Sequence, residues 1–127
     1  MTPERFAELW DAALEKVTEL AVNKGGEYAP GEDRLSNFKL NAERLDLTPL
    51  DVWAVYAGKH WDAIQTYVRD QRLGVSRPRM EGIEGRFHDL IVYAVLGLAL
   101  VEDCSTPCDV EMAFGAISTK KKKSKRK

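Results

Sequence analysis

The feature that most constrains the fold of this chain is the repeating pattern of apolar residues between Met80 and Asp103. Apolar residues recur there at steps of three and four, which is typical of a helix, and they do so on two sides. A helix that is apolar on nearly all sides must be covered on nearly all sides. We therefore expect it to be the central helix of a bundle or to be half-buried in a subunit interface. One side carries Ile83, Phe87, Leu90, Ile91, Ala94, Val95 and Leu98, and the other carries Val92, Tyr93, Leu96, Ala99 and Leu100.

Three further helices are predicted ahead of this one. The first begins after Thr2, a good helix cap, and its apolar repeat ends at a glycine stop in residues 23–26. The second covers roughly residues 34–46. The third covers about 49–72, and its opening sequence TPLD resembles a capping box.

The C-terminal part of the chain is predicted to differ from this bundle. Residues 106–117 have the pattern of a short last helix, whereas residues 119–127 contain no apolar side chain and are expected to be disordered. No strand pattern or internal repeat competes with the helices. The predicted fold class is all-α: a bundle of four main helices plus a short C-terminal helix, in one domain over residues 1–118.

The net charge of −1 hides an uneven distribution. Seven of the 19 basic residues lie in residues 120–127, so the rest of the chain has 12 basic against 20 acidic residues, a net charge of about −8. An acidic body is a poor general binder of nucleic acid, although acidic clusters can bind divalent cations. The basic tail has two interpretations: a weak contact with nucleic acid, or a solubilising segment without a specific partner.

Several classes of protein are not indicated. The most apolar stretch, residues 90–101, has 12 residues and is too short to cross a bilayer. The N-terminus resembles a helix start rather than a signal peptide. Cys104 and Cys108 have neither redox nor zinc-site spacing and are expected to be reduced. We therefore expect a cytoplasmic protein. Serine-hydrolase and P-loop motifs are also lacking.

The start of the last main helix carries the first candidate site. Glu81, Glu84 and His88 share one stripe of this helix, and Asp89 lies beside it, nearer the apolar body. Glu84 and Asp89 could point into a cleft and hold a hard cation, with or without His88. The alternative is a solvated first turn, since acids are favoured at helix N-termini.

The third helix interrupts its apolar pattern with Lys59, His60 and Asp62. His60 falls on the predicted buried side, and Asp62 is about 200° away from it on an ideal helix. Asp62 is therefore the preferred ligand, and His60 is expected to be either a core residue or a residue that hydrogen-bonds to a ligand from behind.

The segment "KGGEYAPGEDRLSNFK", residues 24–39, is long and polar for a connector. With this segment, the motifs "GKHWDAIQTYV" and "EGIEGRFHDLIVYAVLGLAL" make the chain resemble the nucleotide modification associated domain 1 group, which is common in bacteriophage genomes. That group is related to the MazG-like all-α nucleoside triphosphate pyrophosphohydrolases. The resemblance covers about residues 5–103. The positions that match its pattern are Lys24, Tyr28, Asn37, Phe38, Glu84, Asp89 and Tyr93.

The resemblance implies a magnesium-dependent cleavage of a nucleotide between its α and β phosphates, in the host cytoplasm if a phage encodes the chain. Asp89 and Glu84 would carry the chemistry, and Mg²⁺ would be held by Asp62, Glu84, Asp89 and either Glu27 or Asp33. Lys24, Lys39, Lys59 or Arg86 would contact phosphate. Residues 24–39 would cover the nucleotide, with Lys24 and Tyr28 facing it and Asn37 and Phe38 fixing the far end.

Two departures from the superfamily pattern keep a second hypothesis open. In the third helix the segment KHWD has one acid, Asp62, where relatives carry a Glu-x-x-Glu pair, and Arg86 stands where they carry a glutamate before Asp89. The alternative is a catalytically silent module that binds a nucleotide or a protein, such as a phage inhibitor or sponge. Relatives form dimers or tetramers, and a last main helix that is apolar on two sides also predicts a homodimer.

Overall fold

The computed structural model describes residues 1–104 and is all-α, as predicted. Its four helices are α1 (Pro3–Tyr28), α2 (Ser36–Leu45), α3 (Pro49–Leu73) and α4 (Ile83–Cys104). No strand is present in these residues. The short helix expected at 106–117 and the tail at 119–127 lie outside the described residues.

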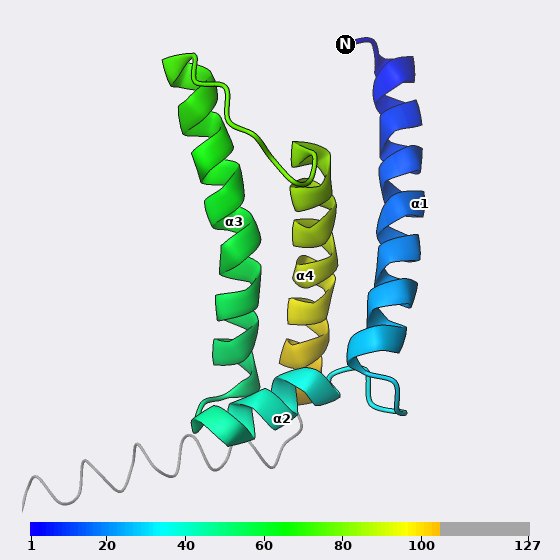
Figure 1. Cartoon of the computed structure of the whole chain (residues 1–127). Coiled ribbons are helices and arrows are strands. Elements are labelled where there is room, and N and C mark those ends of the chain that lie inside the picture. Colours follow the sequence, from blue (N-terminus) through cyan, green and yellow to red (C-terminus); the bar gives the residue numbers. More distant parts are fainter. Residues whose placement is uncertain (105–127) are drawn as a thin grey trace, which may run out of the picture.

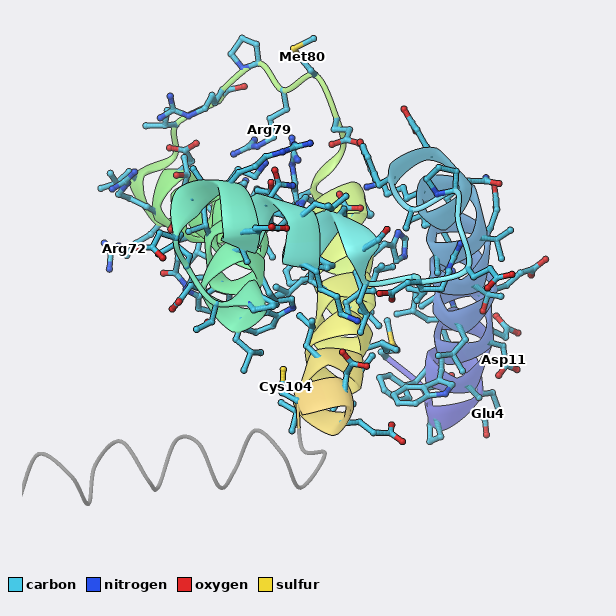
Figure 2. The ribbon with its side chains drawn as sticks, turned by 90° about the horizontal axis from the view of Figure 1, so that it is seen from below. Glu4, Asp11, Arg72, Arg79, Met80 and Cys104 are labelled. Atoms are coloured by element: carbon cyan, nitrogen blue, oxygen red, sulfur yellow. The ribbon has the colours of Figure 1, made fainter. Side chains whose placement is uncertain are left out.

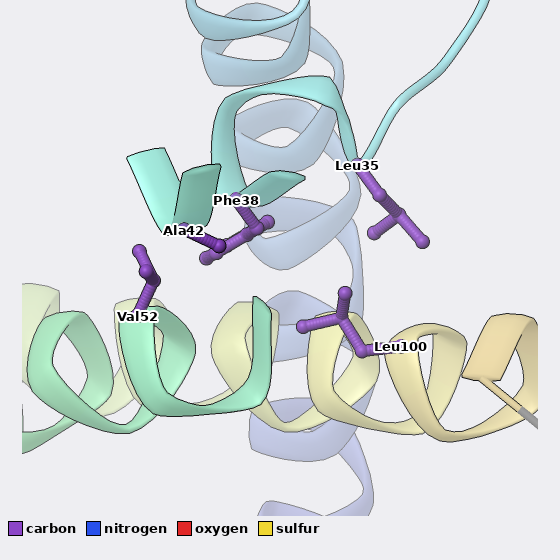
Figure 3. Packing of buried hydrophobic residues seen from close by; sticks show 5 residues of the cluster. All are labelled: Leu35, Phe38, Ala42, Val52 and Leu100. Atoms are coloured by element: carbon purple, nitrogen blue, oxygen red, sulfur yellow. The ribbon is translucent and has the colours of Figure 1, made fainter. Parts of the chain in front are cut away.

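The helix that is apolar on two sides, α4, takes the central place. It lies between α3 and α1, and α3 and α4 run in opposite directions side by side (Figure 1). Seen from below, α2 lies across the ends of α3 and α4 (Figure 2). The helix α1 crosses α4 instead of following it (Figure 3), so a limited part of α1 can be covered by the other helices.

The core lies where α2 packs on α3 and α4 (Figure 3). Phe38 is almost fully buried, and its ring centroid lies 6.0 Å from that of Tyr56 and 6.5 Å from that of Tyr93. Aromatic rings at such separations are favourable beyond the area that they bury. The buried members of this cluster are Leu35, Phe38, Ala42, Val52 and Leu100.

Two predicted helix starts, at Thr2 and Thr48, are confirmed in atomic detail, whereas α4 begins at Ile83 and not near Met80. The Thr2 hydroxyl accepts a hydrogen bond from the Arg5 backbone N–H at 3.2 Å. Thr48 and Asp51 form a reciprocal capping box: each side chain accepts a hydrogen bond from the other residue's backbone N–H. These caps satisfy backbone donors that have no partner within the helix.

The predicted end of the first helix is wrong. Its glycines do not stop α1, which continues to Tyr28 and ends beside buried Ala29. The Arg34 guanidinium packs over Gly25, where a Cβ would overlap it, and donates to the Ala21 carbonyl at 2.9 Å. This tertiary contact with the backbone offsets the helix-breaking tendency of glycine.

The two sides of α4 have different surroundings. The side with Val92 and Leu100 is buried, and the Trp53 indole N–H of α3 donates to the Tyr93 carbonyl at 2.7 Å. The other side is exposed, and so is the N-terminal half of α1. The exposed apolar side chains on these two surfaces are Phe87, Ile91, Val95 and Leu98 on α4, and Phe6, Leu9, Trp10 and Leu14 on α1.

Within residues 1–104, no helix has both the length and the apolar character that crossing a bilayer requires.

Candidate functional site

A buried carboxylate marks the point where three helices meet. Asp89 lies in the second turn of α4 and is 3% exposed. It contacts Lys24 from α1 and faces His60 from α3. We call these three residues the three-helix junction. A carboxylate in such a place requires partners, because burial of an unpaired charge is costly.

Lys24 reaches Asp89 from near the C-terminal end of α1, which crosses α4. The residue lies one turn before the end of α1, and its ammonium makes both a hydrogen bond and an ion pair with Asp89 Oδ1. The Lys24 side chain is 37% exposed, whereas the Asp89 side chain is 5% exposed. Solvent, and a ligand in solvent, can therefore reach the lysine more readily than the carboxylate.

His60 faces the other oxygen of Asp89 without completing a hydrogen bond. Its Nδ1 lies 3.3 Å from Asp89 Oδ2 but is buried and has no hydrogen-bond partner. Its ring packs on Tyr93, with centroids 5.1 Å apart and planes at 35°. The prediction that His60 lies on the buried side of its helix is confirmed. Of its two expected roles, the core residue fits, since the buried Nδ1 makes no hydrogen bond.

The surroundings keep His60 neutral near neutral pH. Burial lowers the pKa of its imidazole, Asp89 opposes that effect, and the positive charges of Lys24, Arg86 and Lys59 lower the pKa further. The pKa of Tyr93 is raised, chiefly by burial and then by the nearby charge of Asp89 and by Tyr28 and Tyr56. Both rings therefore face the junction in uncharged form.

Two predicted phosphate contacts lie close enough to act on this histidine. Arg86 makes an ion pair with Glu81 at 3.2 Å, and Lys59 lies over the Tyr56 ring at 5.3 Å. With Lys24 they bring three cationic groups to the electrostatic environment of His60. Tyr28 is exposed at the end of α1 and contributes to the raised pKa of Tyr93. The structure thus brings Lys24 and Asp89 into contact, and it places Tyr28, Lys59 and Arg86 near enough to shift the pKa of Tyr93 or of His60.

The other predicted metal ligands are not gathered around Asp89. Asp62, Glu84 and Glu27 are exposed. Among residues 1–104, no three His, Cys, Asp or Glu side chains form a group that could hold a metal ion. The magnesium ligand set therefore stays a prediction.

The remaining predicted residues belong to the connection between α1 and α2. Lys39 forms ion pairs with Asp33 at 2.8 Å and with Asp103 at 3.0 Å. Asp103 is 14 residues after Asp89, roughly 21 Å along α4. Asn37 is half-buried and accepts a hydrogen bond from Asn41 through its backbone carbonyl. Lys39 therefore secures the connection to the far end of α4.

A second buried carboxylate was missed by the sequence interpretation. Asp70, in the last turns of α3, is 2% exposed and accepts hydrogen bonds from Arg77 and Arg79 of the following loop. The signal was present as an aspartate followed by arginines seven and nine positions later. An exposed ion pair has the same sequence pattern, so burial could not be deduced from it.

Comparisons with protein-family models, with curated proteins and with solved structures each found no match to this chain.

Proposed function

We propose that this protein binds a nucleotide through its phosphates at the three-helix junction. The observation that supports the proposal is the convergence of Lys24, His60 and Asp89 from three helices, with Lys24 and Asp89 separated by 65 positions in the sequence. Burial of ionisable groups costs free energy. Such groups are enriched at functional sites, where their altered properties are used.

The excess of positive charge favours a phosphate ligand. Lys24, Arg86 and Lys59 are near enough to lower the pKa of His60, Asp89 is the acid that raises it, and Arg86 is also paired with Glu81. Ammonium and guanidinium groups donate strong hydrogen bonds to phosphate oxygens. A phosphate that enters the junction would compete with Asp89 for the partly exposed Lys24 ammonium. Neutral His60 would offer a hydrogen bond without adding charge.

Hydrolysis is the stronger form of this proposal and rests on the resemblance to the pyrophosphohydrolases. Magnesium can be held by one or two carboxylates when substrate phosphates complete its shell. Asp89 would then be the buried ligand and exposed Glu84 a second one after its side chain moves, whereas Asp62 lies about 200° around α3 from His60 and would need α3 to turn. Mg²⁺ would supply charge neutralisation and an activated water in such a site.

The decisive experiment is a pyrophosphate-release assay with a panel of canonical and modified nucleoside triphosphates in the presence of Mg²⁺. We expect release from at least one member and its loss in Asp89→Asn. Asp11→Asn is the matched control, because Asp11 is exposed on α1 and points away from the other helices (Figure 2). Absence of release across the whole panel would refute hydrolysis.

A catalytically silent nucleotide-binding module is the second candidate, and the Lys24–Asp89 contact favours it. A lysine on the carboxylate occupies the position that a metal ion would need. This candidate predicts that a nucleoside triphosphate raises the unfolding temperature without turnover, and that Lys24→Ala removes the stabilisation. Turnover in the assay above would contradict it.

We also propose that the chain forms a homodimer. Exposed Phe6, Trp10 and Leu14 on α1, with Val95 and Leu98 on α4, make large apolar surfaces on a chain of this size. Extended apolar surfaces of this kind mark interfaces. Light scattering should give twice the monomer mass; a monomer at micromolar concentration would refute the assembly.

The basic tail carries a separate proposal, a weak contact of residues 120–127 with nucleic acid. This segment lies outside the described residues, and the proposal rests on its seven basic side chains. Gel shifts with and without the segment test it: a shift that is unchanged on truncation rules out a role for the tail.

A further inference from the structure

A second cationic site lies at the opposite end of α3 from its capping box. Residues 69–79 contain four arginines and one acid, a net charge of +3 on a chain whose body is acidic. The segment spans the last turns of α3 and the loop that leads to α4. Asp70 is ten residues after His60, roughly 15 Å along α3, so this region is distinct from the three-helix junction.

Asp70 holds two of the arginines in fixed positions. Arg77 binds it through two nitrogens, with Nε 2.8 Å from Oδ2 and Nη2 3.1 Å from Oδ1. Arg79 adds a hydrogen bond from Nη2 at 3.1 Å, and its guanidinium lies over the Tyr67 ring at 5.0 Å. Arg79 points back from the loop toward the helices, whereas Met80 points away (Figure 2). A guanidinium held in this way loses little conformational freedom when it binds a ligand.

Arg77 and Arg79 each keep N–H groups that do not bond to Asp70, and these groups lie beside a hollow in the surface. Arg77 Nη1, and Arg79 Nε and Nη1, make no hydrogen bond to the described residues. The hollow has a volume of about 300 Å³ and is lined by polar groups from the end of α3 and the loop. Its lining residues are Asp70, Gln71, Gly74, Val75, Ser76, Arg77 and Arg79.

We propose that this hollow is a binding site for the phosphate group of a small phosphorylated molecule. Arginine guanidinium groups match the geometry of phosphate oxygens, and the hollow's lining carries a net charge of +1 within a segment of net charge +3, which favours an anion. The size of the hollow suits one or two phosphate groups with little else attached, since pockets for larger ligands begin near this volume. Asp70 acts as the positioning residue that aims the guanidinium groups.

The competing explanation is that the arginines do no more than fasten the loop to α3. Fastening requires the bonds to Asp70 alone and predicts no affinity for anions. A phosphate site predicts that anions bind at the donors which Asp70 leaves unused. The two explanations are therefore separated by binding at this site, and a loss of stability in a variant would not separate them.

The experiment is an NMR titration of the full-length ¹⁵N-labelled protein with sodium pyrophosphate at constant ionic strength. We expect saturable shifts of the Arg77 and Arg79 Nε–H signals and of the Val75 and Ser76 amides. Arg79→Lys keeps the charge and leaves the Arg77–Asp70 fork intact, so it should fold. It should bind pyrophosphate about tenfold more weakly, because the fixed planar fork is lost.

Two controls complete the test. Arg44→Lys, on α2, should bind like the wild type. Lys24→Ala should leave the shifts at Arg77 and Arg79 unchanged, so failure of the proposed junction site and failure of this site are distinguishable. Shifts confined to residues 120–127 or to the junction, or equal affinity in Arg79→Lys, would overturn the proposal.

Discussion

Two buried aspartates, Asp89 and Asp70, are held in different ways. Asp70 is bound by two arginines seven and nine residues away, and one of them makes a two-point contact. Asp89 is bound at one oxygen by the flexible side chain of Lys24, 65 residues away, and its other oxygen faces a histidine nitrogen without a hydrogen bond. Both carboxylates are nearly inaccessible to solvent.

The hydrogen bonds of Asp70 are complete, whereas those at the three-helix junction are not. The fork at Asp70 keeps that carboxylate fully bonded, and hydrogen bonding from Arg77 is the main reason why its pKa is lowered. At the junction, the unpartnered Nδ1 of His60 is a buried polar atom that leaves hydrogen-bonding capacity unused. Buried polar groups without partners are uncommon in folded proteins, so their presence favours a ligand-binding role for the junction.

The largest effect is expected from removal of the Lys24 charge. Lys24→Met leaves Asp89 buried without a cation, and we expect a loss of about 2 kcal/mol in the free energy of unfolding, less than for a fully buried pair because Lys24 is partly exposed. Urea denaturation measures it. Lys24→Met with Asp89→Asn should recover most of the loss. Lys16→Met, an exposed lysine on the same helix, should change little; equal losses in both lysine variants would contradict the assignment.

The next largest loss of stability is expected from a Cβ added at Gly97, next to Trp53. Trp53 holds the Tyr93 carbonyl, and a Cβ at Gly97 would lie 2.8 Å from the Trp53 ring. Gly97→Ala should therefore lower the free energy of unfolding by about 1 kcal/mol, since the clash exceeds the gain in helix propensity. At Gly58, on α3, a Cβ would meet nothing within 4 Å. Gly58→Ala should raise stability, and a rise at both positions would show that the Trp53 contact adapts freely.

The pH dependence of stability distinguishes the two sites without any disruption of packing. The pKa of His60 is lowered in the folded chain, so below its ordinary value near 6.5 the unfolded chain binds a proton that the folded chain does not. The free energy of unfolding should therefore fall as pH decreases from about 6.5, with a slope that corresponds to at most one proton taken up on unfolding. His60→Gln should flatten this part of the curve. A slope that is identical in the variant would contradict the assignment.

The Asp70 carboxylate should respond in a lower range. Its pKa is depressed by Arg77, so the stability that it contributes is present above its ordinary value near 3.8 and is lost as pH falls through the lowered pKa. Denaturation measured from pH 8 to pH 2 in wild type and in Asp70→Asn resolves the two ranges. A flat wild-type curve below pH 4, matching that of the variant, would contradict this ordering.

The smallest effect is expected at Arg79. Arg79→Lys removes one hydrogen bond to Asp70 and a contact with the Tyr67 ring, but the two-point contact from Arg77 remains. We expect a loss of stability smaller than that of Lys24→Met, measured by urea denaturation. A larger loss would reverse the comparison and make Arg79 the principal partner of Asp70.

Local signals in the sequence were sufficient for most of the fold. The caps at Thr2 and Thr48, and apolar residues at steps of three and four, predicted the helices because both effects act over one or two turns. The glycine stop failed at Gly25 because Arg34 stabilises the helix there from outside it. The burial of His60 followed from its place on the apolar side of α3.

The sequence by itself determined that this chain is helical and which residues are candidates for chemistry. The tertiary structure alone decided which of them meet. Lys24 reaches Asp89 because α1 crosses α4, whereas Asp62 stays exposed on α3. Helix periodicity fixes the side of a helix on which a residue lies, but contacts between helices depend on how they cross and on how their side chains pack. For this reason the same spacing rules predicted Asp89 as a site residue and missed Asp70.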